Sequence, residues 1–276
     1  MLKNILYIIF PFLLVAQTEP NENLQKNIPR VWTLTNGMIH TAPGDFIKGG
    51  SIVIRDGKIE AVGRYIKSPK DAYEINLEGA HVYAGFIESW LETKSYNDKS
   101  KTKRRHWDLK VRPDYRSVDN FDLKEKDLKV LRSLGFTSAQ LAPTQGIFRG
   151  QTGIVSLSDS PRAINSSIAQ VIDFKYRTKG ARTYPRSLLG VIAHIRQTFY
   201  DSDWYLKAQE IVQAYPTENE PISSNSSLES LGLSKALNKP FIFVSSNENS
   251  NSRAMNITKE FGLTPWILGS GYEYKN

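Results

Sequence analysis

The chain has 276 residues, no cysteine, 40% hydrophobic and 23% charged residues, and a formal net charge of +8. This composition is ordinary for a globular protein and excludes collagen-like, coiled-coil and wholly disordered chains. The lack of cysteine excludes disulfides, thiolate metal sites and a cysteine nucleophile. A metal site made of three or four imidazoles would need nearly all of the four histidines, which are His40, His81, His106 and His194.

A short apolar run near the amino terminus predicts export. Residues 5–16 are apolar, follow Lys3 and end in Ala16, which is typical of a secretory signal peptide over residues 1–18. The run is shorter than the roughly 20 residues that span a bilayer. We therefore expect a periplasmic or extracellular protein, with an uncleaved amino-terminal anchor as the alternative, and a polar linker over residues 19–30.

Residues 31–79 carry the pattern of a small β-sandwich unit. Asp56-Gly57 lies between two β-rich runs and is typical of a two-residue hairpin turn. Two further strands are expected at 74–77 and 81–87. The second of them is apolar enough for a strand that is buried on both faces.

After residue 80 the pattern alternates between helices and strands, which favours a parallel sheet with crossover helices. The expected helices cover residues 123–134, 187–215, 228–237 and 249–261, and the second is expected to be broken or kinked near residues 201–204. The expected strands cover residues 137–142, 241–244 and 266–268. Residues 146–174 are expected to form an insertion with strands of its own at 153–157 and 168–174, opened by a turn-rich loop over residues 145–153.

Two segments resemble the amidohydrolase superfamily, especially its imidazolonepropionase-like branch. They are residues 54–59 (IRDGKI) and residues 84–92 (AGFIESWLE). The resemblance implies a small β-sandwich followed by a (β/α)8 barrel, with a metal-binding HxH pair on the first barrel strand. It predicts an α/β fold in which residues 80–276 form the first half of a TIM barrel.

Trp90 and Glu92 stand where the resemblance places the two histidines. Side chains two apart on a strand point the same way, so two imidazoles here would reach one zinc or other divalent ion. Tryptophan has no lone pair for a metal, whereas Glu92 and Glu88 are oxygen ligands suited to a weak site for a hard cation. We therefore expect no catalytic residue and no bound metal on this strand.

The number of strands indicates an incomplete barrel. A full barrel needs eight strands in roughly 250 residues, whereas about four barrel strands are expected after residue 80. The sequence therefore predicts either a fragment of a longer protein or a chain that needs a second chain to complete the barrel.

Four residues are candidates for substrate binding in loops over the barrel mouth, where barrel enzymes keep their sites. They are His106, Trp107, Arg112 and Arg149. The basic residues between 94 and 116 are expected in a solvated loop rather than a nucleic-acid surface, because the protein is expected to be exported. His194 is expected on a helix face, bonded to a neighbour, and Lys175 in a surface run.

Two functions remain open from the sequence. The first is an exported amidohydrolase-like hydrolase of carbon–nitrogen bonds in a small amide. It is expected to be weak or inactive because Trp90 and Glu92 stand at the HxH positions and the later ligand strands are absent. The alternative is a non-catalytic envelope protein that binds a ligand or partner at the barrel mouth. Neither involves nucleic acid, and contact with a membrane is expected only through the signal segment.

Overall fold

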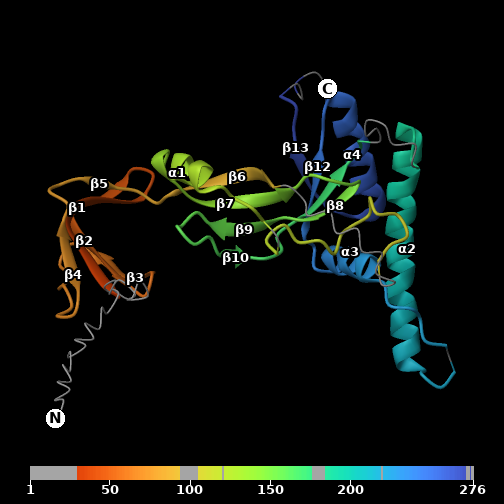
Figure 1. Ribbon diagram of the computed structural model, residues 1–276, viewed down its shortest axis with the longest axis horizontal. Coiled ribbons are helices and arrows are strands. Elements are labelled where there is room, and N and C mark those ends of the chain that lie inside the picture. The colour runs from red at the N-terminus through yellow and green to blue at the C-terminus, as the bar shows by residue number, and fades with distance from the viewer. Residues whose placement is uncertain are drawn as a thin grey trace, which may run out of the picture. The chain divides into compact units, whose positions relative to one another are not determined.

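The computed structural model describes residues 30–93, 105–119, 121–175, 184–218, 220–271 and 274. The expected signal peptide and the first part of the basic loop lie outside these residues. The chain divides into two compact units, with the boundary between Ala84 and Gly85 (Figure 1). Within the described residues, no helix is long and apolar enough to cross a membrane.

The first unit is one five-stranded sheet. Its strands are β1 (Val31–Ala42), β2 (Asp45–Arg55), β3 (Lys58–Gly63), β4 (Tyr73–Asn76) and β5 (His81–Val82). Their order is β3-β2-β1-β4, and β5 also pairs with β1. Both residues of the turn between β2 and β3 have positive φ, 48° at Asp56 and 76° at Gly57, so the predicted hairpin is confirmed.

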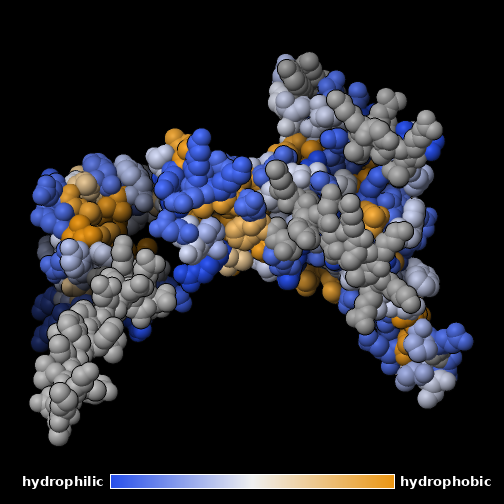
Figure 2. Space-filling view, in the orientation of Figure 1, coloured by the Kyte–Doolittle hydropathy of each residue, from blue (hydrophilic) through white to orange (hydrophobic). Residues whose placement is uncertain are grey.

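The expected β-sandwich is a single sheet in the described residues. All five strands belong to one sheet, which is connected through β1 and β2. Val31 and Val53 are buried, whereas Phe46 and Ile59 are 55% and 66% exposed. Figure 2 shows the resulting apolar surface on this unit.

The second unit contains two four-stranded sheets. The strands of the first sheet are β6 (Phe86–Thr93), β7 (Phe136–Pro143), β9 (Gly153–Ser156) and β10 (Ala163–Asn165), in the order β10-β9-β7-β6. β6 and β7 are parallel, and α1 (Glu125–Ser133) connects them, as the sequence predicts. This is one complete βαβ crossover.

The strands of the second sheet are β8 (Phe148–Gln151), β11 (Gln170–Asp173), β12 (Pro240–Val244) and β13 (Thr264–Leu268), in the order β13-β12-β11-β8. β11, β12 and β13 are parallel, and β8 is antiparallel to β11. The connecting helices are α2 (Leu188–Ala214), α3 (Ser226–Ala236) and α4 (Glu248–Phe261).

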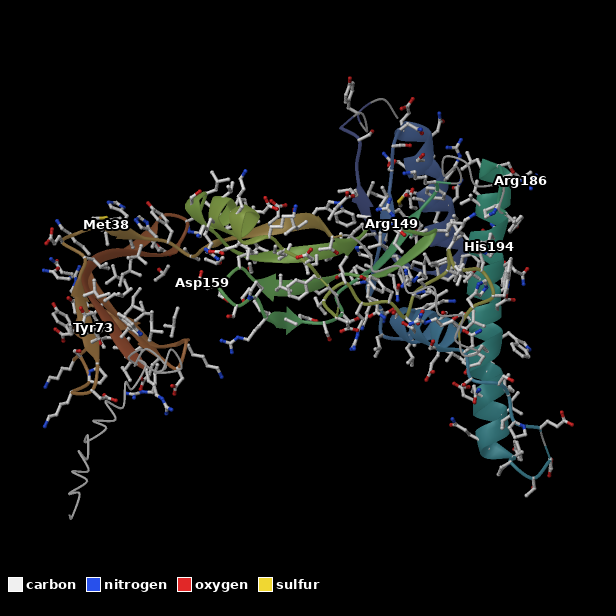
Figure 3. All side chains as sticks on the ribbon, viewed as in Figure 1. Met38, Tyr73, Arg149, Asp159, Arg186 and His194 are labelled. Carbon is white, nitrogen blue, oxygen red and sulfur yellow. The ribbon has the colours of Figure 1, made fainter. Side chains whose placement is uncertain are left out.

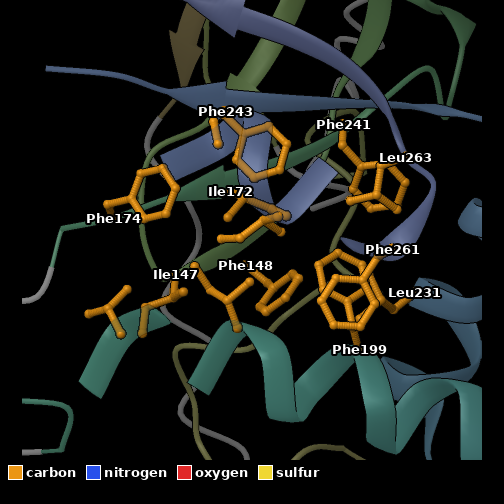
Figure 4. Close-up of a cluster of buried hydrophobic side chains, with 14 of the residues drawn as sticks. Ile147, Phe148, Ile172, Phe174, Phe199, Leu231, Phe241, Phe243, Phe261 and Leu263 are labelled. Carbon is orange, nitrogen blue, oxygen red and sulfur yellow. The ribbon is translucent and has the colours of Figure 1, made fainter. Parts of the chain in front are cut away.

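The main core lies between this second sheet and its helices (Figure 4). Phe148 and Phe241 from the strands pack with Phe199 of α2 and Phe261 of α4. The ring centroids of Phe199 and Phe261 are 4.8 Å apart, and Phe199 is fully buried. The described residues form a mixed α/β structure that is not closed into a barrel.

Three predictions about individual elements are wrong. The expected break in α2 near residues 201–204 is absent, because Ser202 faces α3 and its hydroxyl donates to the carbonyl of Leu228 at 2.7 Å. Part of the expected turn-rich loop is strand β8. β11 belongs to the parallel sheet rather than to an insertion, since it lies between β8 and β12.

The expected strand over residues 81–87 is also wrong, because it is divided between the two units. β5 pairs with β1, whereas β6 begins at Phe86 and pairs with β7. A Cβ at Gly85 would lie 2.7 Å from Cβ of Thr137, so a glycine is required where the chain enters the second unit. Phe86 and Ile87, which point to opposite faces of β6, are 63% and 59% exposed, so the start of this strand is buried on neither face.

Candidate functional site

A pocket of about 650 Å³ lies at the carboxyl ends of β11 and β12. Asp173 ends β11 and Val244 ends β12, and both line the pocket together with residues of the first turns of α4. The carboxyl ends of parallel strands are where open α/β sheets and barrels bind ligands. We therefore take this pocket as the candidate site.

Arg149 is the central charged residue of the site. It stands in β8 at a bulge, because Phe148 pairs with Ile172 while Gly150 pairs with Val171. Its side chain is 8% exposed and forms an ion pair with Asp173, whose side chain is 9% exposed. Its Nη1 lies 4.0 Å from Oε1 of Glu92, at the end of β6. The guanidinium thus lies beside carboxylates from strands of two different sheets, β6 and β11.

Trp90 and Glu92 point the same way from β6, as their spacing of two predicts. The indole Nε1 of Trp90 donates to Oε1 of Glu92 at 3.4 Å. The ring of Trp90 also packs against the buried cluster of Ala169, Val171 and Ile242. The third candidate on this strand, Glu88, accepts a hydrogen bond from the backbone N–H of Trp90 at 3.1 Å. Trp90 therefore connects β6 to the second sheet.

The opposite wall of the pocket is formed by the start of α4. Asn247 is the N-cap, and its side chain accepts from the backbone N–H of Ser250 at 3.0 Å. Arg253, one turn further along α4, and Lys175, just after β11, add two cations to the pocket. The amino terminus of α4, which lies at the pocket, adds the partial positive charge of the helix dipole to these two cations.

A second group of titratable residues ties the loop after β6 to α2. Nε2 of His194 lies 3.0 Å from Oδ2 of Asp108, and both side chains are at least nine-tenths buried. The ring centroids of His106 and His194 are 5.7 Å apart, and those of Trp107 and His194 are 5.4 Å apart. Tyr184 also contacts His194. Figure 3 shows His194 on α2, away from Arg149.

The electrostatics of this group favour a neutral His106 and a charged Asp108. Burial lowers the pKa of His106, and the nearby imidazole of His194 lowers it further, against an opposing contribution from the backbone contact with Asp108. Burial opposes ionisation of Asp108, but its contact with His194 and the backbone N–H of Lys110 hold its pKa below the usual value. The near-complete burial of His194 makes this a structural connection rather than a site open to substrate.

The four expected substrate-binding residues lie in three places. Arg149 lines the pocket with Glu92 beside it. His106 and Trp107 belong to the group around His194. Arg112 lies over the ring of Tyr115, with its guanidinium carbon 4.7 Å from the centroid.

Comparison with solved structures places this arrangement in a known fold. A crystal structure of an amidohydrolase from Thermotoga maritima matches with a TM-score of 0.66 and 20% sequence identity, over 85% of this chain and 63% of that chain. The chain has the fold of the amidohydrolases. The resemblance in the sequence is thus confirmed at the level of the fold, and the chain spans less than two thirds of that amidohydrolase's length.

The other comparisons with known proteins give no further information about the fold. A prolidase solved with N-methylphosphonate-L-proline matches with a TM-score of 0.40 and 13% identity, over 85% of this chain and 65% of that chain, a score too low to place residues. No family model and no curated protein matches the sequence.

The amidohydrolase fold implies a divalent metal, and the residues on β6 do not fit one. Trp90 offers an N–H donor and no lone pair at the first of the two ligand positions. Glu92 contacts that N–H and the Arg149 guanidinium, which already carries a positive charge. No group of three or more histidine, aspartate or glutamate side chains that could hold a metal ion occurs in the part of the chain that the structure describes.

Sequence reasoning missed most of the pocket. Asp173, Lys175, Asn247 and Arg253 line it together with Arg149. The signal that points to Asn247 is its place three residues after an apolar strand and just before a helix, which is typical of an N-cap near a strand's carboxyl end. Asp173 and Lys175 likewise follow an apolar run.

Proposed function

We propose that this chain forms the first part of a (β/α)8 barrel and binds a small molecule in the pocket at the carboxyl ends of β11 and β12. In this proposal the residues of β6 support no metal-dependent hydrolysis. The observation that carries it is the buried guanidinium of Arg149 between Glu92 and Asp173.

The position of Arg149 argues against a divalent cation between these two carboxylates. A second cation there would be repelled by the guanidinium, and the repulsion is strong where few water molecules screen it. Asp173 is already committed to Arg149, and it accepts a hydrogen bond from the backbone N–H of Lys175 at 2.9 Å. Arg149 thus supplies the positive charge of the site from within the chain.

The composition of the pocket supports ligand binding. Its volume of about 650 Å³ lies within the range of small-molecule pockets. Phe174, Leu188 and Val244 give it an apolar wall, and the cations and the polar residues of α4 face them. A mostly apolar cleft with a few convergent polar groups is the usual form of a ligand site.

A second candidate function is hydrolysis of a carbon–nitrogen bond in a small amide. The amidohydrolase fold favours it, as do two carboxylates, Glu92 and Asp173, at the carboxyl ends of parallel strands. Such a reaction would draw its metal ligands from outside the described residues. One fold carries many functions, so the site decides between the two candidates.

An assay on the full chain separates them. A panel of N-acyl amino acids and cyclic imides is incubated with the protein with and without added Zn²⁺ or Mn²⁺, and both turnover and the thermal midpoint are measured. We expect saturable stabilisation without metal-dependent turnover. The stabilisation should be lost in Val244→Trp, which fills the pocket, and kept in Leu134→Trp, where the leucine is 62% exposed on another element. Metal-dependent turnover that is lost in Glu92→Ala would overturn the proposal.

A further inference from the structure

We propose that the ligand of this pocket carries an anionic group, with carboxylate or phosphate oxygens, bound by Arg149, Lys175 and Arg253. This inference rests on the proposed ligand-binding function and names the chemical class of the ligand. The rest of the ligand is an apolar body that packs on Phe174, Leu188 and Val244.

The charges that line the pocket are unbalanced. Arg149, Lys175 and Arg253 are cations, whereas Asp173 is the single carboxylate that lines the pocket. Asp173 pairs with Arg149. Within the described residues, the ammonium of Lys175 and the guanidinium of Arg253 are paired with no carboxylate. The lining residues therefore carry an excess of two positive charges, and an excess of one remains when Glu92 beside Arg149 is included, which complements an anion.

Arg149 also has an unused donor. Its side chain is more than nine-tenths buried, yet its Nε makes no hydrogen bond with the described residues. A buried guanidinium N–H without an acceptor is unfavourable, because it has lost its water and gained no partner. Arg149 lines the pocket, so an anionic oxygen bound there supplies an acceptor for the donors of this guanidinium.

The start of α4 adds to the same preference. α4 has 14 residues, and the N–H groups of a helix's first turn have no acceptor within the helix. One of them, the N–H of Ser250, donates to the side chain of the N-cap Asn247. Asn249 and Ser250 from this turn line the pocket. Glu248 is also in the first turn but does not line the pocket. Helix amino termini bind carboxylates and phosphates through these groups.

A matched pair of probes tests the sign of the charge. N-acetyl-L-leucine and N-acetyl-L-leucinamide share an apolar body and differ in one carboxylate, and both are titrated against the full chain at constant ionic strength, with inorganic phosphate as a third probe. Binding is followed by the shift of the thermal midpoint Tm. We expect the carboxylate or phosphate to stabilise the protein and the neutral amide to bind at least about tenfold more weakly, since a charged hydrogen bond is lost.

Two variants locate the effect. Arg253→Gln should weaken binding of the anionic probes about tenfold, whereas Lys207→Gln, which removes the same charge from an exposed position of α2 outside the pocket, should leave it unchanged. Equal binding of the acid and the amide would overturn the anionic ligand while leaving the ligand pocket in place. Equal weakening in both variants, or no stabilisation by any of the three probes, would also overturn the inference. Failure of the proposed function shows separately, as metal-dependent turnover.

Discussion

The Arg149–Asp173 pair gives the sharpest test of the site's construction. Arg149→Met keeps much of the side-chain volume and removes the charge, so that Asp173 stays behind with 9% of its side chain exposed. Removing one partner of a buried ion pair costs about 3–5 kcal/mol, because the other charge remains without compensation. The backbone N–H of Lys175 still donates to Asp173, so we expect a loss near the lower limit, about 3 kcal/mol.

The proper assay is urea unfolding followed by tryptophan fluorescence. Four of the five tryptophans lie in the second unit, namely Trp90, Trp107, Trp204 and Trp266. The fluorescence therefore reports mainly on the unit that contains the Arg149–Asp173 pair. The double variant Arg149→Met/Asp173→Asn should recover about 2 kcal/mol of unfolding free energy, because it leaves no buried charge.

The control is Arg196→Met, which breaks an exposed pair with Glu260. These two side chains are 44% and 27% exposed, so we expect a loss below about 1 kcal/mol. If Arg149→Met cost no more than this control, the reasoning about a buried and committed guanidinium would be refuted.

Three further outcomes follow from the structure. The folded-state pKa values of His106 and Asp108 lie below their usual values of 6.5 and 3.8, so the unfolded chain binds more protons on acidification. The unfolding free energy should therefore fall as pH drops below 6.5, and fall further as pH drops below 3.8. His106→Gln should reduce the loss of unfolding free energy between pH 7.5 and pH 5, measured by chemical denaturation at pH 7.5, 6 and 5. The same loss in the variant as in the unmodified chain would contradict this. Gly85→Ala should cost about 1–3 kcal/mol by overlap with Thr137, with partial recovery in Gly85→Ala/Thr137→Ala, and no loss in chemical denaturation would count against the close approach. Phe199→Ala should cost about 3–5 kcal/mol in the same assay, because the ring is fully buried, and a loss under about 1 kcal/mol would show that the core is not packed this way.

Local sequence signals predicted the elements that depend on local chemistry. The Asp56-Gly57 turn requires positive φ at both residues, which few other pairs allow, so the hairpin was predictable. α1 followed from its leucine spacing and β7 from the run after it. These features need no information about distant residues.

The wrong predictions depend on packing between distant segments. The polar residues near Ser202 suggested a break in α2, but the Ser202 hydroxyl is satisfied by the carbonyl of Leu228, and this contact is not visible in the local pattern. The apolar pattern of β11 would be the same in an insertion as in a central strand, so the sequence does not predict its place between β8 and β12. The exposure of Phe86 and Ile87 depends on which elements pack against β6, which residue types alone do not give.

The site was predictable in part for the same reason. The spacing of Trp90 and Glu92 placed both on one face of a strand, and Arg149 was singled out as a candidate for the mouth. Its partner Asp173 is 24 positions further along the chain, and Arg253 is 80 positions beyond Asp173. No sequence spacing connects them, because the sheet order brings them together.

Metal content tests the central claim most directly. The full chain is incubated with Zn²⁺ or Mn²⁺, dialysed and analysed for metal per chain, alongside Glu92→Gln and Arg149→Met. Because the Arg149 guanidinium lies between Glu92 and Asp173, we expect the unmodified chain to retain much less than about one metal ion per chain. Glu92→Gln should retain the same amount of metal. Retention of about one equivalent that is lost in Glu92→Gln would contradict the account.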